Sequence, residues 1–148
     1  MSARTTRATR ATLLPLLVSA LFGCVGLNAV AETGGRGRGP AQDWSGNPRV
    51  GVASFYANRF AGRKMADGTP MDPQGDNAAS RSLPLGTRAR VTNLQTGQSA
   101  LVTIRDRGPY VKGRIVDLSP ATARLVGITP KEGLATVDVA PIELPNRP

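Results

Sequence analysis

Residues 87–118 read TRARVTNLQTGQSALVTIRDRGPYVKGRIVDL, and this stretch decides the fold class. Apolar and polar residues alternate over 88–94 and again over 99–105, which predicts two half-buried strands. The four residues 95–98 between them include a glycine, which is typical of a hairpin connection. A turn containing Gly-Pro follows, and a further short strand is expected over 114–118. The pattern indicates an all-β domain built from short strands.

The flanking sequence adds two strands, a helix and a long loop. Strands are predicted over 50–56 and 135–144. Residues 119–126 begin with Ser-Pro and are followed by glycine, the N-cap, first-turn and end signals of a short helix. Residues 57–86 are polar and contain many glycines and prolines, so we predict an extended loop with one helical turn. Loops of this length in compact domains are often functional. We expect a small, closed or nearly closed β-barrel.

The N-terminal 31 residues have the features of an export leader. Three arginines precede an uncharged run over 11–27, and residues 29–31 read Ala-Val-Ala, a small-x-small cleavage site. We therefore expect residues 1–31 to be a signal peptide and the protein to be exported to the periplasm or cell envelope. The alternative is lipid anchoring at Cys24, which ends a loosely lipobox-like Leu-Phe-Gly-Cys. Contact with a membrane is expected only in that case.

The rest of the chain is expected to form one basic domain. Residues 32–48 are rich in glycine and proline, which predicts a disordered linker before a folded domain at 49–145. The 148 residues carry a net charge of +9, which favours attraction to anionic envelope polymers. No zinc-ligand spacing or recognised nucleic-acid motif accompanies this charge. We expect a monomer without nucleic-acid partner, metal or cofactor.

Four segments resemble the rare lipoprotein A family of double-psi β-barrels. They are GVASFYANRFAGRKMADGTPMD (51–72), NAASRSLPLGTRARVTNL (77–94), VTIRDRGPYVKGRIVDLSPATARLVGI (102–128) and GLATVDVAPIEL (133–144). The resemblance implies a six-stranded barrel, a groove for glycan strands and lytic transglycosylase action on peptidoglycan. Many members continue into a peptidoglycan-binding repeat domain, and we expect this protein to lack it.

The expected reaction can be run by a single carboxyl group. Glycosidic cleavage needs a proton on the leaving oxygen. In a lytic transglycosylase the sugar's own 6-hydroxyl attacks, so one carboxyl can act as acid and then as base. The candidates are Asp117, Asp106 and Asp72. Asp117 and Asp106 match acidic positions of related barrels. Each candidate also has a structural interpretation: Asp117 as a buried anchor, Asp106 as a turn cap or a partner of Arg107, and Asp72 as a turn residue.

Two positions depart from the family pattern. Thr69 stands where many members have glutamate, and Ser80 stands where many have histidine. The chain contains no histidine, so catalysis would depend on the aspartates alone. The alternative function is therefore a non-catalytic glycan-binding module like the expansins. In either case aromatic rings can stack on sugars and arginines can reach substrate carboxylates. The expected substrate-binding residues are Tyr56, Thr69, Ser80, Arg107, Tyr110 and Arg114.

Overall fold

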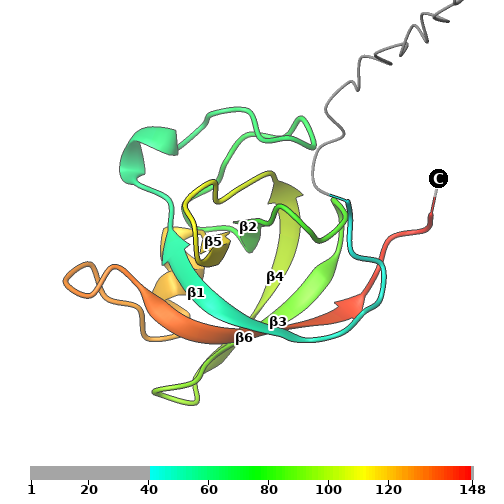
Figure 1. The fold of residues 1–148 in the computed structure, drawn as a ribbon. Coiled ribbons are helices and arrows are strands. Elements are labelled where there is room, and N and C mark those ends of the chain that lie inside the picture. The colour runs from blue at the N-terminus through cyan, green and yellow to red at the C-terminus, as the bar shows by residue number, and fades with distance from the viewer. Residues whose placement is uncertain (1–40, 148) are drawn as a thin grey trace, which may run out of the picture. The chain divides into compact units, whose positions relative to one another are not determined.

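The computed structural model describes residues 41–147, which form a closed six-stranded β-barrel (Figure 1). The elements are β1 (Arg49–Phe55), the 3-10 helix η1 (Asn58–Phe60), β2 (Asn77–Ala79), β3 (Arg88–Asn93), β4 (Ser99–Asp106), β5 (Arg114–Leu118), α1 (Pro120–Leu125) and β6 (Ala135–Glu143). The strands close in the order β1-β5-β2-β4-β3-β6. This architecture confirms the predicted all-β barrel with a short helix. The predicted signal peptide lies outside the described residues.

Two parallel strand pairs bring distant parts of the chain together. β1 pairs in parallel with β5, and β2 pairs in parallel with β4, while the other neighbours are antiparallel. Because β2 lies between β4 and β5, Ala79 is paired with Asp106 on one side and with Asp117 on the other. Adjacent strands are about 4.8 Å apart, so the Cα atoms of the two aspartates lie roughly 10 Å apart across β2. The topology thus places both predicted catalytic acids in one region.

Small aliphatic side chains fill the barrel. In β4, Val102 and Ile104 are buried whereas Leu101 is 47% exposed, as the alternating pattern predicted. The helix α1 adds Ala123 to the same core. Its N-cap prediction is confirmed, since the Ser119 hydroxyl accepts a hydrogen bond from the Thr122 amide at 3.1 Å. That hydroxyl also donates to the Gly75 carbonyl at 2.6 Å, which fixes the helix against the long loop.

The strand β2 lies inside the segment that was predicted to be a loop. Its three residues, Asn-Ala-Ala, are all buried, so the sequence has no polar alternation to reveal a strand. The strand exists because β4 and β5 satisfy its backbone on both sides.

The described part of the predicted linker contacts the barrel. The Asp43 amide donates to the Ser82 carbonyl at 2.6 Å, and the Arg147 guanidinium lies 5.4 Å from the centre of the Trp44 ring. Among residues 41–147, no helix has both the length and the apolar character required to cross a bilayer.

Candidate functional site

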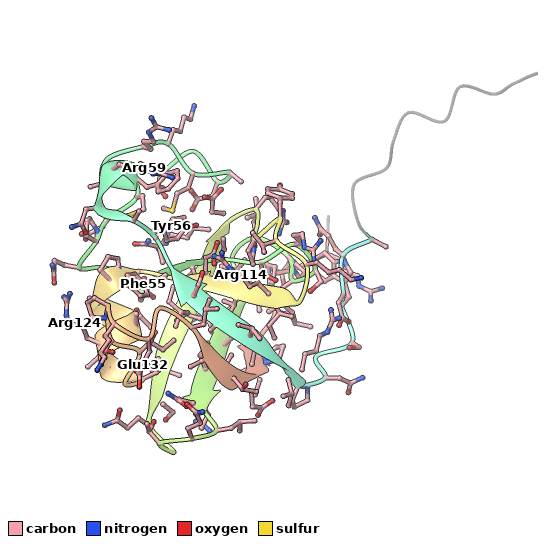
Figure 2. The ribbon with its side chains drawn as sticks, turned by 60° about the vertical axis from the view of Figure 1, so that its left-hand side comes forward. Phe55, Tyr56, Arg59, Arg114, Arg124 and Glu132 are labelled. Atoms are coloured by element: carbon pink, nitrogen blue, oxygen red, sulfur yellow. The ribbon has the colours of Figure 1, made fainter. Side chains whose placement is uncertain are left out.

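A groove of about 470 Å³ lies where β1, β4 and β5 end. Its walls come from the segment between Phe55 and Phe60, the connection after β4, and two side chains of β5. Figure 2 shows Tyr56 and Arg114 on neighbouring parts of this region. Six of the nine predicted site residues line the groove: Tyr56, Asp106, Arg107, Tyr110, Arg114 and Asp117.

Asp117 is held by two neighbours through a single carboxylate oxygen. The parallel register of β1 and β5 sets Ser54 beside Asp117. The Ser54 hydroxyl and the Arg114 guanidinium both donate to Asp117 Oδ1, and Arg114 also donates to the Ser54 hydroxyl. Asp117 Oδ2 has no hydrogen-bond partner among residues 41–147. The carboxyl group is therefore fixed by one oxygen while the other is available to a molecule in the groove.

Both oxygens of Asp106, by contrast, are occupied. Oδ1 accepts hydrogen bonds from the backbone amides of Ala66 at 3.0 Å and Arg107 at 2.8 Å, and Oδ2 accepts one from the Tyr56 hydroxyl at 3.0 Å. The pKa of Tyr56 is raised by burial, by the charge of Asp106 and its hydrogen bond, and by the charge of Asp117. Tyr56 therefore remains a donor. Through these three hydrogen bonds Asp106 connects the long loop at Ala66, the turn after β4 at Arg107 and the side chain of Tyr56.

The two predicted arginines both have partners within the protein. The Arg107 guanidinium donates to the carbonyls of Ser80 at 3.0 Å and Leu83 at 2.6 Å. Partial burial lowers the pKa of Arg107, against the opposing influence of Tyr110 and Asp106. Arg107 thus fastens the turn after β4 to the segment after β2. Like Arg114, it shapes the groove before any substrate arrives.

Aromatic side chains form one wall of the groove. Tyr56 and Phe60 meet edge to face, with ring centroids 6.0 Å apart and planes at 64°. The Arg59 guanidinium lies 5.1 Å from the Phe60 ring centre, within cation–π range. Tyr110 is 75% exposed and lines the groove. These rings offer apolar faces of the kind that stack on sugars.

Three predicted residues lie outside the groove. Thr69 and Asp72 line a separate pocket of about 200 Å³. The Thr69 hydroxyl donates to the Asp67 carboxylate at 2.6 Å, while Asp72 accepts from the Gln74 amide at 2.8 Å, the turn role given above as its alternative. Ser80 is only 3% exposed, and its hydroxyl accepts from the Leu83 amide at 3.2 Å. Its hydroxyl is thus directed into local structure.

Ser54 and Arg59 belong to the site but are not among the residues predicted from the sequence. Ser54 lies between Ala53 and Phe55 at the end of β1 and is 5% exposed. A buried hydroxyl at such a position requires a hydrogen-bond partner. A serine among apolar strand residues was the only signal in the sequence. The partner of Ser54 is Asp117 on β5, and the parallel pairing of β1 with β5 cannot be predicted from local sequence patterns. Arg59 lies in η1, within the predicted loop, and no sequence motif marks it as a site residue.

The closed barrel, its two parallel strand pairs and the groove that contains Asp106 and Asp117 define a double-psi β-barrel protein with a surface groove that carries two aspartates. Residues 49–139 match the family described as lytic transglycolase, and the chain belongs to that family.

Curated relatives agree with this assignment, and a solved structure shares the fold. The chain is 44% identical over 104 residues to the endolytic peptidoglycan transglycosylase RlpA of Pasteurella multocida, covering 70% of the chain and 35% of the relative. It is 40% identical over 104 residues to the RlpA of Pseudomonas aeruginosa, covering 70% and 30%. The chain thus spans about a third of the length of these relatives. A Clavibacter michiganensis expansin variant crystallised with cellohexaose shares the fold, with a TM-score of 0.51 and 19% identity over 69% of this chain and 54% of the expansin.

Proposed function

We propose that this protein is a lytic transglycosylase that cleaves the glycan strands of peptidoglycan and leaves 1,6-anhydro-muramic ends. The observation that carries the proposal is the pair of aspartates in one groove of a member of the lytic transglycolase family. Asp117 has one oxygen without a hydrogen-bond partner among the described residues, and both oxygens of Asp106 are hydrogen-bonded. The two relatives compared above are named as endolytic peptidoglycan transglycosylases.

In the proposed reaction Asp117 is the catalytic acid and base. Its Oδ2 gives a proton to the glycosidic oxygen as the bond from that oxygen to the anomeric carbon breaks. The 6-hydroxyl of the same sugar then bonds to the anomeric carbon and returns its proton to Asp117, which restores the carboxyl group. Ser54 and Arg114 support this cycle because they hold Oδ1 and so orient Oδ2.

Asp106 is proposed to position groups and to supply charge. Its negative charge near the cleaved bond would stabilise the positive charge that develops at the anomeric carbon. Its hydrogen bond to Tyr56 fixes a ring on which the sugar can stack. The bond to the Ala66 amide holds the long loop beside the groove.

Substitution of Asp117 tests the assignment. Asp117→Asn keeps the shape of the side chain but cannot cycle a proton, so product release from sacculi should fall about 100- to 10,000-fold. Sacculus binding should change little, whereas the thermal transition should fall, because Arg114 loses the charge of its ion-pair partner. Asp72→Asn is a matched control, because Asp72 lies in a different pocket. Wild-type activity in Asp117→Asn would show that another group supplies the proton.

A non-catalytic glycan-binding module is the second candidate. The observations that favour it are Thr69 and Ser80 at the departing positions, the absence of histidine, and the fold shared with an expansin crystallised with cellohexaose. In that function Asp117 accepts a hydrogen bond from a sugar hydroxyl. Wild-type protein that binds sacculi, loses binding in Asp117→Ala and releases no product would support this candidate.

Export and cleavage after Ala31 complete the proposal. Two observations support export: the relatives are named as peptidoglycan transglycosylases, and the N-terminal sequence has a leader pattern. Intact-mass analysis of the protein from a periplasmic fraction should give a chain beginning at Glu32. A diacylated chain beginning at Cys24 would contradict cleavage at this site.

A further inference from the structure

Three arginines line the groove: Arg59, Arg107 and Arg114. Two of them are engaged within the protein, because Arg107 donates to two backbone carbonyls and Arg114 pairs with Asp117. Arg59, by contrast, is exposed, and among residues 41–147 it belongs to no ion pair. Arg59 is therefore the cation of the groove that is available to a ligand.

The Phe60 ring holds Arg59 beside the aromatic wall of the groove. The Arg59 guanidinium lies over this ring, 5.1 Å from its centre, and Phe60 in turn packs edge to face against Tyr56. Figure 2 shows Arg59 and Tyr56 on the same side of the barrel. The contact with the ring engages no hydrogen-bond acceptor, so the planar fork of N–H donors, which fits a carboxylate bidentately, remains available. A sugar stacked on Tyr56 would therefore lie near a site for an anionic group.

The glycan of peptidoglycan offers one kind of anionic group to this site. Its N-acetylglucosamine residues are uncharged, whereas a muramic residue carries a lactyl ether whose carboxylate is free wherever no peptide is attached. The lactyl group is the feature that distinguishes this polymer from uncharged glycans of the same linkage. Arg59 complements the charge of the lactyl carboxylate at the wall where the sugar would stack, and such pairing selects one ligand over another.

We propose that Arg59 is a specificity-determining residue that pairs with the lactyl carboxylate of a muramic residue bound in the groove. The inference rests on the proposed function, because the glycan must first occupy the groove. It assigns recognition of the substrate carboxylate to Arg59 rather than to Arg107 and Arg114, whose guanidinium groups already have partners. The pairing favours muramic glycan over a glycan of the same length without carboxylates.

The test compares two soluble ligands that differ only in this carboxylate. One is a tetrasaccharide prepared from sacculi and freed of its peptides by an amidase, and the other is the same tetrasaccharide with its lactyl carboxylates converted to primary amides. Binding is measured by calorimetry in an Asp117→Asn parent, so that neither ligand is consumed. Arg59→Gln should weaken binding of the carboxylate ligand about two- to five-fold, the range of an exposed ion pair, and leave binding of the amide ligand unchanged.

Arg63→Gln is the matched control. Arg63 is also exposed and also lies over Phe60, 5.5 Å from the ring centre, but it is not part of the groove lining. Its replacement removes the same charge and the same kind of ring contact, so the affinity for both ligands should stay nearly unchanged. Arg59→Lys keeps the charge without the planar fork and should lose less affinity for the carboxylate ligand than Arg59→Gln.

The outcomes separate this inference from the function on which it rests. Weakening by Arg63→Gln as large as that by Arg59→Gln would overturn the pairing and attribute the effect to general charge. Equal affinity of the parent for the two ligands, or an Arg59→Gln variant that binds both as the parent does, would also overturn it while leaving the proposed function intact. If the parent binds neither ligand, the proposed function fails and the pairing fails with it.

Discussion

Replacement of Ser54 by alanine tests how the groove holds its catalytic carboxyl. The Ser54 hydroxyl contacts both charged partners, donating to Asp117 and accepting from Arg114. Ser54→Ala removes both hydrogen bonds and leaves the Arg114–Asp117 pair as the remaining restraint on the carboxyl group. Asp117 should therefore rotate away from the orientation in which Oδ2 faces the groove.

The size of the effect follows from these contacts. Hydrogen bonds to charged groups are worth about 1.5–3 kcal/mol each, and part of this is recovered when Arg114 and Asp117 close on each other. We expect a loss of about 1–3 kcal/mol in the free energy of unfolding. If orientation accounts for about 1.4–2.8 kcal/mol of the barrier, kcat should fall about 10- to 100-fold, since each 1.4 kcal/mol is a factor of ten. KM should change little, because the sugar-stacking wall remains.

A second buried serine supplies the control. Ser80 is buried to a similar degree, 3% exposed against 5%, but its hydroxyl accepts from the Leu83 amide outside the groove. Ser80→Ala should lower the urea midpoint comparably while preserving kcat on peptidoglycan. If Ser54→Ala and Ser80→Ala lose the same stability and both keep wild-type kcat, the positioning role of Ser54 is refuted.

Three further predictions concern charge and protonation. The variant Tyr110→Phe has Tyr56 as its sole tyrosine. Because burial and the charge of Asp106 raise the pKa of Tyr56, no tyrosinate absorbance should appear near pH 10 while this variant is folded. The stability that Tyr56 contributes is fully present below about pH 10 and declines as pH rises toward the folded pKa. Sacculus binding should weaken with salt, because charges are screened within about 8 Å at physiological ionic strength; unchanged binding at about 1 M would assign it to short-range contacts. Asp72→Asn should alter stability by no more than about 0.5 kcal/mol and product release by no more than about two-fold, and a larger loss of product would return Asp72 to the site.

The sequence predicted the elements whose signals are local. The alternation of β3 and β4 and the Ser-Pro start of α1 depend on neighbours within a few residues, and all three elements form as expected. The strand β2 was missed because its three buried residues receive their hydrogen bonds from strands far along the chain. Parallel pairing leaves no turn signal, so the barrel's connectivity came from the family resemblance.

The same distinction applies to the candidate site. The family motifs point to Asp106 and Asp117, and the pairing of both with Ala79 brings them to one groove. The same motifs point to Thr69 and Ser80, but local hydrogen bonds direct their hydroxyls away from the groove. Ser54, which holds Asp117 together with Arg114, could not be found, because its contact with Asp117 depends on the register of β1 against β5.

Product analysis of peptidoglycan cleavage tests the central claim most directly. Purified sacculi are incubated with the wild-type protein and with Asp117→Asn, and the soluble fragments are examined by mass spectrometry. The account predicts fragments ending in 1,6-anhydro-muramic acid from the wild type and a loss of at least about 100-fold in the variant. Fragments with ordinary reducing ends would indicate hydrolysis by water, and a wild-type protein that binds sacculi without releasing fragments would contradict the enzymatic function.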